Sequence, residues 1–240
     1  MNKYDLLIKN GMIHTAVESF EAEIGVSEGK ITAIGQNLGH AERVIDAEGM
    51  LVLPGGIDAH CHIEQESSTR IMTADDFYSG SVSAAFGGNT TFLPFAAQHR
   101  GQSLREVVDT ARERARNKAV IDYGLHLIIS DPTQNVLEEE LPSLIKEGYT
   151  SFKVYMTYEM LKINDGEMLD ILAIARRHGA LTMVHAENNE VINWISDRLI
   201  RHGYNAPKFH AVSHSPIAES EASRRAIDLA RLVLALRPPR

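Results

Sequence analysis

The chain has 240 residues, of which 44% are hydrophobic and 23% are charged, and this composition excludes a largely disordered protein. A net charge of -8 argues against nucleic acid or an anionic membrane surface as the main partner, so a small molecule is expected instead. The chain shows neither a signal-peptide core nor an apolar stretch long enough to cross a membrane, and a single cysteine, Cys61, excludes an internal disulfide, so a cytoplasmic location is expected.

Residues 4–53 are predicted to form short strands separated by turns. Asn-Gly interrupts the segment 4–15, and Glu-Gly interrupts the segment 23–35; both dipeptides are typical of tight hairpin turns. A small N-terminal β-sandwich segment over residues 1–53 is therefore the first predicted domain.

From Pro54 onward, apolar strands alternate with longer amphipathic segments. This β-then-α order predicts an α/β fold with a parallel sheet, either open and doubly wound or closed as a (β/α)8 barrel. The second predicted domain spans residues 54–240, and its expected strands lie at 52–63, 89–97, 121–130, 150–158 and 180–188.

Two histidines, His60 and His62, stand at the end of the first of these strands, in the stretch IDAHCHIEQ. Alternation along a strand predicts that both point to one face while Cys61 points to the other. The spacing suits two imidazole ligands on one zinc ion, although a hydrogen-bonded pair in a polar pocket explains it as well. His185 ends a later strand and Lys153 lies in the strand before it. Because the carboxyl ends of parallel strands converge, the histidine pair, Lys153 and His185 are expected at equivalent heights on separate strands, which favours the metal site.

A lysine, Lys153, lies inside the apolar strand SFKVY. Because burying an ammonium group costs several kcal/mol, this lysine needs a salt bridge, an extended path to water, or a chemical change. One such change is carboxylation of a neutral amine by carbon dioxide, which gives an anion able to bridge two metals. Tyr155 shares the face of Lys153 and could direct its hydroxyl at negative charge developing on a substrate, or be an ordinary barrel aromatic.

Five motifs together resemble the dihydropyrimidinase and hydantoinase branch of the amidohydrolase superfamily, in that family's order, over residues 1 to about 232. They are PGGIDAHCH at 54–62, GGNTT at 87–91, SFKVYMTY at 151–158, VHAEN at 184–188 and HAVSHSPIAESEA at 210–222. The resemblance implies a TIM-like (β/α)8 barrel beside a small β-sandwich, and hydrolysis of cyclic amides by a hydroxide that bridges two zinc ions. It also implies tetramers, so a homo-oligomer is expected.

The resemblance also assigns roles to residues. His60 and His62 would hold the first zinc, a carboxylated Lys153 would bridge, His185 would hold the second zinc, and Tyr155 would stabilise the oxyanion. In the family a later histidine completes the second metal shell and a later aspartate binds the first metal and moves the proton; neither is found in this sequence.

The tail 234–240, LALRPPR, departs from the family, because two prolines cannot lie inside a strand. A frameshift or premature stop near residue 233 is therefore expected. It would leave an incomplete barrel of about the first five strands and a truncated chain that is weakly active or inactive.

Alternatives remain for the function and for three further histidines. A non-catalytic structural protein on the same scaffold, or another cyclic amidase such as allantoinase, would share most of these motifs. His210 and His214 are spaced for one helix face, but flanking prolines and the family's loop at this place disfavour a helix and a role as substitute ligands. His126 is interpreted as a satisfied core or pocket residue, and Cys61 as a packing residue.

Overall fold

The computed structural model describes residues 4–67 and 71–235. Contacts divide the chain into two compact units, Met1–Gly56 and Ile57–Arg240. The boundary lies close to the predicted one at residue 53, and the two domains stay a prediction. The tail at 236–240, on which the expected truncation rests, lies outside the described residues.

The first unit contains two small sheets. One has the order β5-β4-β1-β6 and the other the order β3-β2-β7. Their strands are β1 (Tyr4–Lys9), β2 (Met12–His14), β3 (Ser19–Glu21), β4 (Glu23–Ser27), β5 (Lys30–Gly35), β6 (Ala41–Asp46) and β7 (Leu51–Val52).

Both predicted turns of this unit are present, but only one of them joins neighbouring strands of one sheet. Glu28 and Gly29, with φ values of 51° and 72°, join the antiparallel strands β4 and β5 as the dipeptide predicts. Asn10 and Gly11 instead join β1 to β2, which belong to different sheets. The chain passes close to β7 here: a Cβ on Gly11 would lie 2.5 Å from Cγ2 of Val52.

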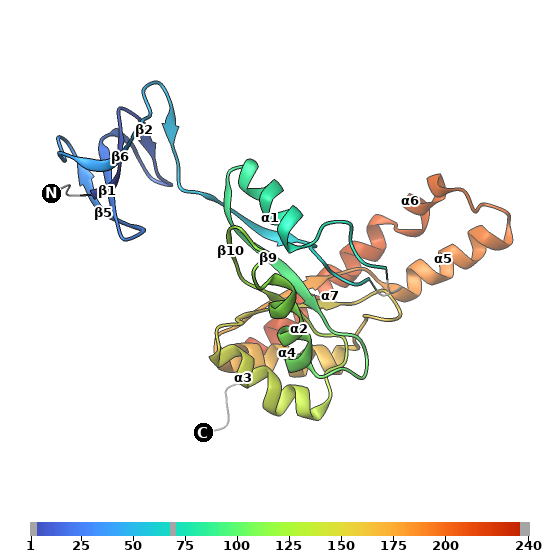
Figure 1. The fold of residues 1–240 in the computed structure, drawn as a ribbon. Helices are drawn as coiled ribbons and strands as arrows, with labels where there is room; N and C mark the ends of the chain where they lie inside the picture. The colour runs from blue at the N-terminus through green and yellow to red at the C-terminus, as the bar shows by residue number, and fades with distance from the viewer. Residues whose placement is uncertain (1–3, 68–70, 236–240) are drawn as a thin grey trace. The chain divides into compact units, whose positions relative to one another are not determined.

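The second unit is built on a curled parallel sheet covered by helices (Figure 1). Every strand pair for which a register is defined in this sheet is parallel. Its strands are β8 (Gly56–Cys61), β9 (Asn89–Ala97), β10 (Asp122–Tyr123), β11 (His126–Ile128), β12 (Ser151–Tyr155) and β13 (Leu181–His185).

Strands β10 and β11 form one interrupted strand along β9. Tyr123 pairs with Phe92, and His126 pairs with Phe95, three residues further along both chains. Only two residues separate β10 from β11. A chain that passed from one edge of β9 to the other and ran in the same direction would need a long crossover, so β10 and β11 lie on the same edge of β9. The sheet therefore has five strand positions, in the order β8, β9, β10 with β11, β12 and β13.

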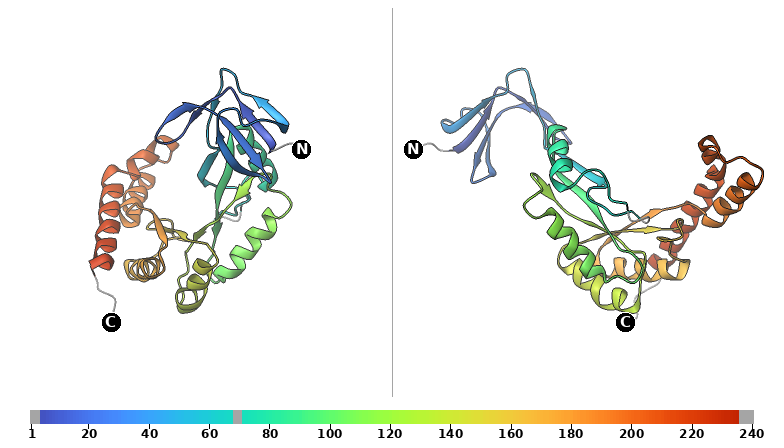
Figure 2. Two further views of the ribbon diagram at one scale, coloured as in Figure 1. Left: turned by 90° about the vertical axis from the view of Figure 1, so that its left-hand side faces the viewer. Right: turned by 45° about the vertical axis from the view of Figure 1, so that its right-hand side comes forward.

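Helices cover the outer face of the curled sheet (Figure 2, left). The main apolar core lies between that face and α2, α3, α4 and α7, and includes Leu127, Phe152 and Val154, all fully buried. The helices are α1 (Phe77–Phe86), α2 (Leu104–Ala115), α3 (Leu141–Lys146), α4 (Asp165–His178), α5 (Asn189–Arg201), α6 (His210–Ser213) and α7 (Pro216–Ala235), with short turns at Val136–Glu140 and Pro207–Phe209.

Local signals in the sequence fix the ends of α4. Asn164 and Glu167 form a reciprocal capping box at its start, and Gly179 ends it in the left-handed conformation with φ of 73°.

The expectation of a loop at His210 and His214 is wrong: His210 begins the short helix α6, which ends before His214. Within the described residues, no helix is both long and apolar enough to cross a membrane.

Candidate metal centre

The two strand-end histidines gather on one aromatic ring. The ring centroids of His60 and His62 lie 4.8 and 5.0 Å from that of Phe95, which projects from β9, and 5.4 Å from each other. Burial, followed by the charge of the nearby Lys153, lowers the pKa of His60, so its imidazole is held in the neutral form that a metal needs.

Cys61 points away from the two histidines, as strand alternation predicts. It packs beside a separate apolar cluster that contains Ile63, Phe77 and Phe92. Burial raises the pKa of its thiol to about 11, and Asp58 adds to this effect, so the thiolate is strongly disfavoured. Both findings favour packing as the role of Cys61.

Lys153 lies on β12 and only 9% of its surface is exposed. Its Nζ atom lies 5.8 Å from the ring centre of Phe95 and 5.5 Å from that of Tyr155. Among the described residues, no carboxylate lies within ion-pair distance of this amine, so a salt bridge does not explain its burial. Burial lowers the pKa of Lys153, which favours the neutral amine.

Tyr155 and His185 complete the row of side chains. Tyr155 is paired with His185 across β12 and β13, and their rings stack 5.5 Å apart, whereas Lys153 is paired with Met183. The expectation that Lys153 and His185 lie at equal height is therefore wrong, because His185 lies two residues nearer the carboxyl end. Burial raises the pKa of Tyr155, so its hydroxyl keeps its proton.

Two neighbours of these side chains were not singled out from the sequence. Nε2 of His185 lies 2.8 Å from the carboxylate of Glu187, and Nδ1 of His62 lies 2.7 Å from Oε1 of Gln65. Both partners follow their histidine by two or three residues, so proximity in sequence was the available signal. Phe95 was missed as well, although alternation along 89–97 would have placed it on the inner face.

The donor set fits zinc only if Lys153 takes part. Among the described residues, no three His, Cys, Asp or Glu side chains are grouped so that they could hold a metal ion. Lys153 would have to supply a further donor, and an amine becomes an oxygen ligand only as a carbamate. Its burial without a carboxylate partner is the condition under which a neutral amine is favoured.

His126 is buried and satisfied, as interpreted from the sequence. Its Nε2 lies 2.9 Å from the Ala59 carbonyl and its Nδ1 lies 2.5 Å from the Ser151 hydroxyl. His210 and His214 stack on each other with ring centroids 3.9 Å apart. That they are not substitute ligands stays a prediction.

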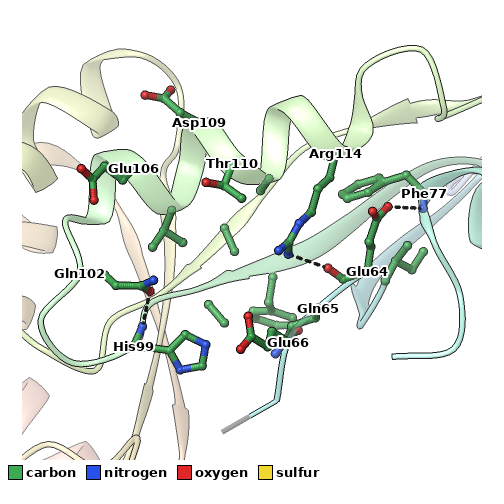
Figure 3. A pocket seen from close by; sticks show the side chains of 16 residues that line it. Glu64, Gln65, Glu66, Phe77, His99, Gln102, Glu106, Asp109, Thr110 and Arg114 are labelled. Atoms are coloured by element: carbon green, nitrogen blue, oxygen red, sulfur yellow. Dashed lines mark hydrogen bonds between the residues drawn. The ribbon is translucent and has the colours of Figure 1, made fainter. Parts of the chain in front are cut away.

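A cavity of about 450 Å³ adjoins the candidate metal centre, because Phe95 is among its lining residues. Figure 3 shows this cavity, with Glu64, His99 and Arg114 among the labelled side chains that line it. It is lined by the loop after β8, the end of β9 and one side of α2, where Arg114 donates a hydrogen bond to the Glu64 carbonyl. None of the five predicted site residues lines it, so it lies beside the row of donors.

A model of the Amidohydrolase family matches residues 51–219, which include every residue of this row. The chain belongs to the amidohydrolase family. The resemblance stated from the motifs is confirmed, and it covers about 95% of the chain.

Several curated relatives of this amidohydrolase chain are named D-hydantoinase. A D-hydantoinase of Geobacillus stearothermophilus is 45% identical over 94% of this chain and 48% of its own length. A D-hydantoinase of Ralstonia pickettii is 47% identical over 95% of this chain and 50% of its own length. A solved structure titled "Structure of D-hydantoinase" superposes with a TM-score of 0.92 at 46% identity, over 95% of this chain and 50% of that one. The chain thus spans about half the length of the curated relatives it matches.

Proposed function

We propose that this chain carries the metal-binding part of a zinc-dependent cyclic amidohydrolase of the dihydropyrimidinase and hydantoinase type. The substrate would be a small cyclic amide such as a dihydropyrimidine or a hydantoin. The observation that carries the proposal is Lys153 on β12, a buried amine that has no carboxylate partner among the described residues and lies 5.8 Å from the ring of Phe95, on which His60 and His62 rest. Strand β12 pairs with β13, which ends in His185. The D-hydantoinase relatives support the substrate class.

In this proposal His60 and His62 would hold one zinc ion and His185 would hold the other, and carboxylated Lys153 would serve as a ligand of both. The neutral amine of Lys153 attacks the carbon of carbon dioxide and loses one proton, which leaves a carbamate with two oxygen donors. Bound zinc would supply hydroxide near neutral pH and polarise the amide carbonyl.

Tyr155 would act on the substrate oxygen. Because burial raises the pKa of Tyr155, the phenol stays protonated and can donate a hydrogen bond where negative charge develops on the amide oxygen. Its ring stacks on His185 and lies near the amine of Lys153, so the hydroxyl is carried by a side chain held on two sides.

The described donors are few for two metals. The first zinc would have two imidazoles and the carbamate, and the second would have one imidazole and the carbamate, whereas tightly held zinc takes about four ligands. We therefore expect the 240-residue chain alone to hydrolyse dihydrouracil or hydantoin weakly or not at all. The same shortage supports the alternative of a non-catalytic dihydropyrimidinase-like protein.

Further parts of the proposal concern the fold and the setting. We infer that the five strand positions are the first five of a (β/α)8 barrel, because they are parallel, curled and covered by helices on the outside. The N-terminal β-sandwich, the homo-oligomer and the cytoplasmic location stay predictions.

Zinc titration of the 240-residue chain tests the ligand assignment, with and without bicarbonate in the buffer. We expect bicarbonate to strengthen zinc binding in the natural chain, and ¹³C-bicarbonate to give a carbamate resonance that Lys153→Ala abolishes. Lys146→Ala, which removes an exposed lysine of α3, is the matched control and should change neither measurement. Zinc binding that is insensitive to both bicarbonate and Lys153→Ala would contradict the bridging role.

A parallel assay of ring opening separates the two candidate functions. Turnover of dihydrouracil or hydantoin that His60→Ala abolishes would identify a catalyst. Zinc binding without turnover would favour the non-catalytic alternative for this chain.

A further inference from the structure

His126 joins β8, which carries His60, to β12, which carries Lys153. It lies on β11 with 6% of its surface exposed, and each of its ring nitrogens has one partner. One partner is the carbonyl of Ala59, which forms the peptide bond to His60. The other is the hydroxyl of Ser151, which precedes Lys153 by two residues on the same face of β12.

The two partners fix the tautomer of His126. A backbone carbonyl only accepts hydrogen bonds, so Nε2 carries the proton and donates it to the Ala59 carbonyl at 2.9 Å. Nδ1 then has a lone pair and accepts the Ser151 hydroxyl at 2.5 Å. With both nitrogens engaged, the ring has no lone pair left for a metal, which excludes His126 as a ligand in this arrangement.

The position of β8 depends on few attachments. Among the described strands β8 pairs only with β9, so its other edge has no strand partner. The bond from His126 gives β8 a second attachment, next to the first proposed ligand. The His126 ring also lies 5.1 Å from the ring centre of Phe95, on which His60 and His62 rest.

We propose that His126 is a positioning residue that sets the spacing between His60 on β8 and Lys153 on β12 and so tunes zinc affinity. This inference rests on the proposed function for the zinc itself, but the link between the strands does not. The ring acts through the Ala59 carbonyl and the Ser151 hydroxyl, and touches neither metal nor substrate.

Two substitutions separate the two bonds. His126→Gln places an amide nitrogen near the position of Nε2 and can keep the bond to the Ala59 carbonyl. His126→Asn places an amide oxygen near Nδ1 and can keep only the bond to Ser151. We expect zinc binding to weaken about tenfold in His126→Asn, the lower end of the effect for groups that orient ligands, and to stay within about threefold of the natural chain in His126→Gln.

A second readout needs no metal. Loss of the bond to the Ala59 carbonyl should shift the backbone amide resonance of His60 in the zinc-free chain of His126→Asn, and His126→Gln should restore it. The ¹⁵N shifts of the His126 ring in the natural chain should show Nε2 protonated and Nδ1 unprotonated.

Leu127→Ala is the matched control for a merely structural effect. Leu127 is the next residue of β11, is fully buried, and faces the helices on the opposite side of the sheet. The Leu127→Ala substitution should lower the unfolding temperature at least as much as His126→Asn does. Its zinc affinity and its His60 amide resonance should stay those of the natural chain.

Equal zinc affinities in His126→Asn and the natural chain would overturn the proposal, and so would an equal loss in Leu127→Ala. If the natural chain binds no zinc, the proposed function fails. In that case the His60 amide resonance and the ring tautomer test whether His126 links β8 to β12. An unshifted His60 resonance in His126→Asn would refute this link.

Discussion

Replacing Lys153 by methionine should stabilise the chain in the absence of metal and bicarbonate. Methionine keeps the apolar stem and much of the volume of the side chain but removes the amine, so the packing against Phe95 and Tyr155 is retained. What is lost is a buried amine that has no carboxylate partner among the described residues.

The size of the effect follows from two opposing terms. Burial of an ammonium group costs several kcal/mol in real proteins. The two rings, whose centres lie 5.8 and 5.5 Å from Nζ, each return about 0.5–1 kcal/mol. Because a lysine can also neutralise itself or reach toward water, we expect a net gain of about 1–2 kcal/mol in the free energy of unfolding.

The gain should depend on pH in one direction. Burial lowers the pKa of Lys153 below its ordinary value of 10.5, so between the two values the unfolded chain binds the proton and the folded chain does not. Stability of the natural chain therefore rises as pH increases through the folded pKa, and the cost of the lysine disappears above 10.5. The advantage of Lys153→Met should shrink accordingly.

Urea unfolding of both chains, with a chelator and without bicarbonate, measures the difference at about pH 7 and about pH 10. The slope of the transition should be unchanged, since the buried surface is the same. If Lys153→Met proves less stable than the natural chain by 1 kcal/mol or more, or if the difference is the same at both pH values, the reasoning from amine burial is wrong.

Three further predictions use other measurements. Lys153→Ala should lose zinc binding, and a small carboxylic acid added to the buffer should restore part of it by occupying the vacated space; zinc titration decides, and full binding without the acid would contradict the bridging role. Gly179→Ala should lower the free energy of unfolding by about 1–2 kcal/mol, because an L side chain is strained at φ of 73°; a neutral result in urea unfolding would show that the end of α4 relaxes. Asn164→Ala should cost about 1 kcal/mol through loss of the capping box with Glu167, while Asn164→Ser should retain most of the stability.

Features that depend on neighbours in sequence could be predicted, and those that depend on pairing between distant strands could not. The common direction of His60 and His62, opposite to Cys61, follows from the two-residue period of a strand. The relative positions of Lys153 and His185 along their strands were predicted wrongly. They depend on the pairing register of β12 with β13, which cannot be read from the sequence of either strand alone.

Turn dipeptides show the same limit. Glu28-Gly29 and Asn10-Gly11 both place the chain in the left-handed region that a tight turn needs, at least at the first residue. A turn signal specifies that the chain reverses or bends, but not which strand its ends will join. At Gly11 the chain passes close to β7 and leads from one sheet into the other.

The bond between His126 and Ala59 spans 67 residues of sequence, and this separation has a kinetic consequence. Pairing of β12 with β13 closes a short loop around α4, whereas β8 must find β9 and His126 after much of the intervening chain has ordered. Contacts between distant residues are slow because loop closure precedes any gain from them. We therefore expect the proposed metal site to be among the last features to form during refolding, so that acquisition of zinc would report the final step.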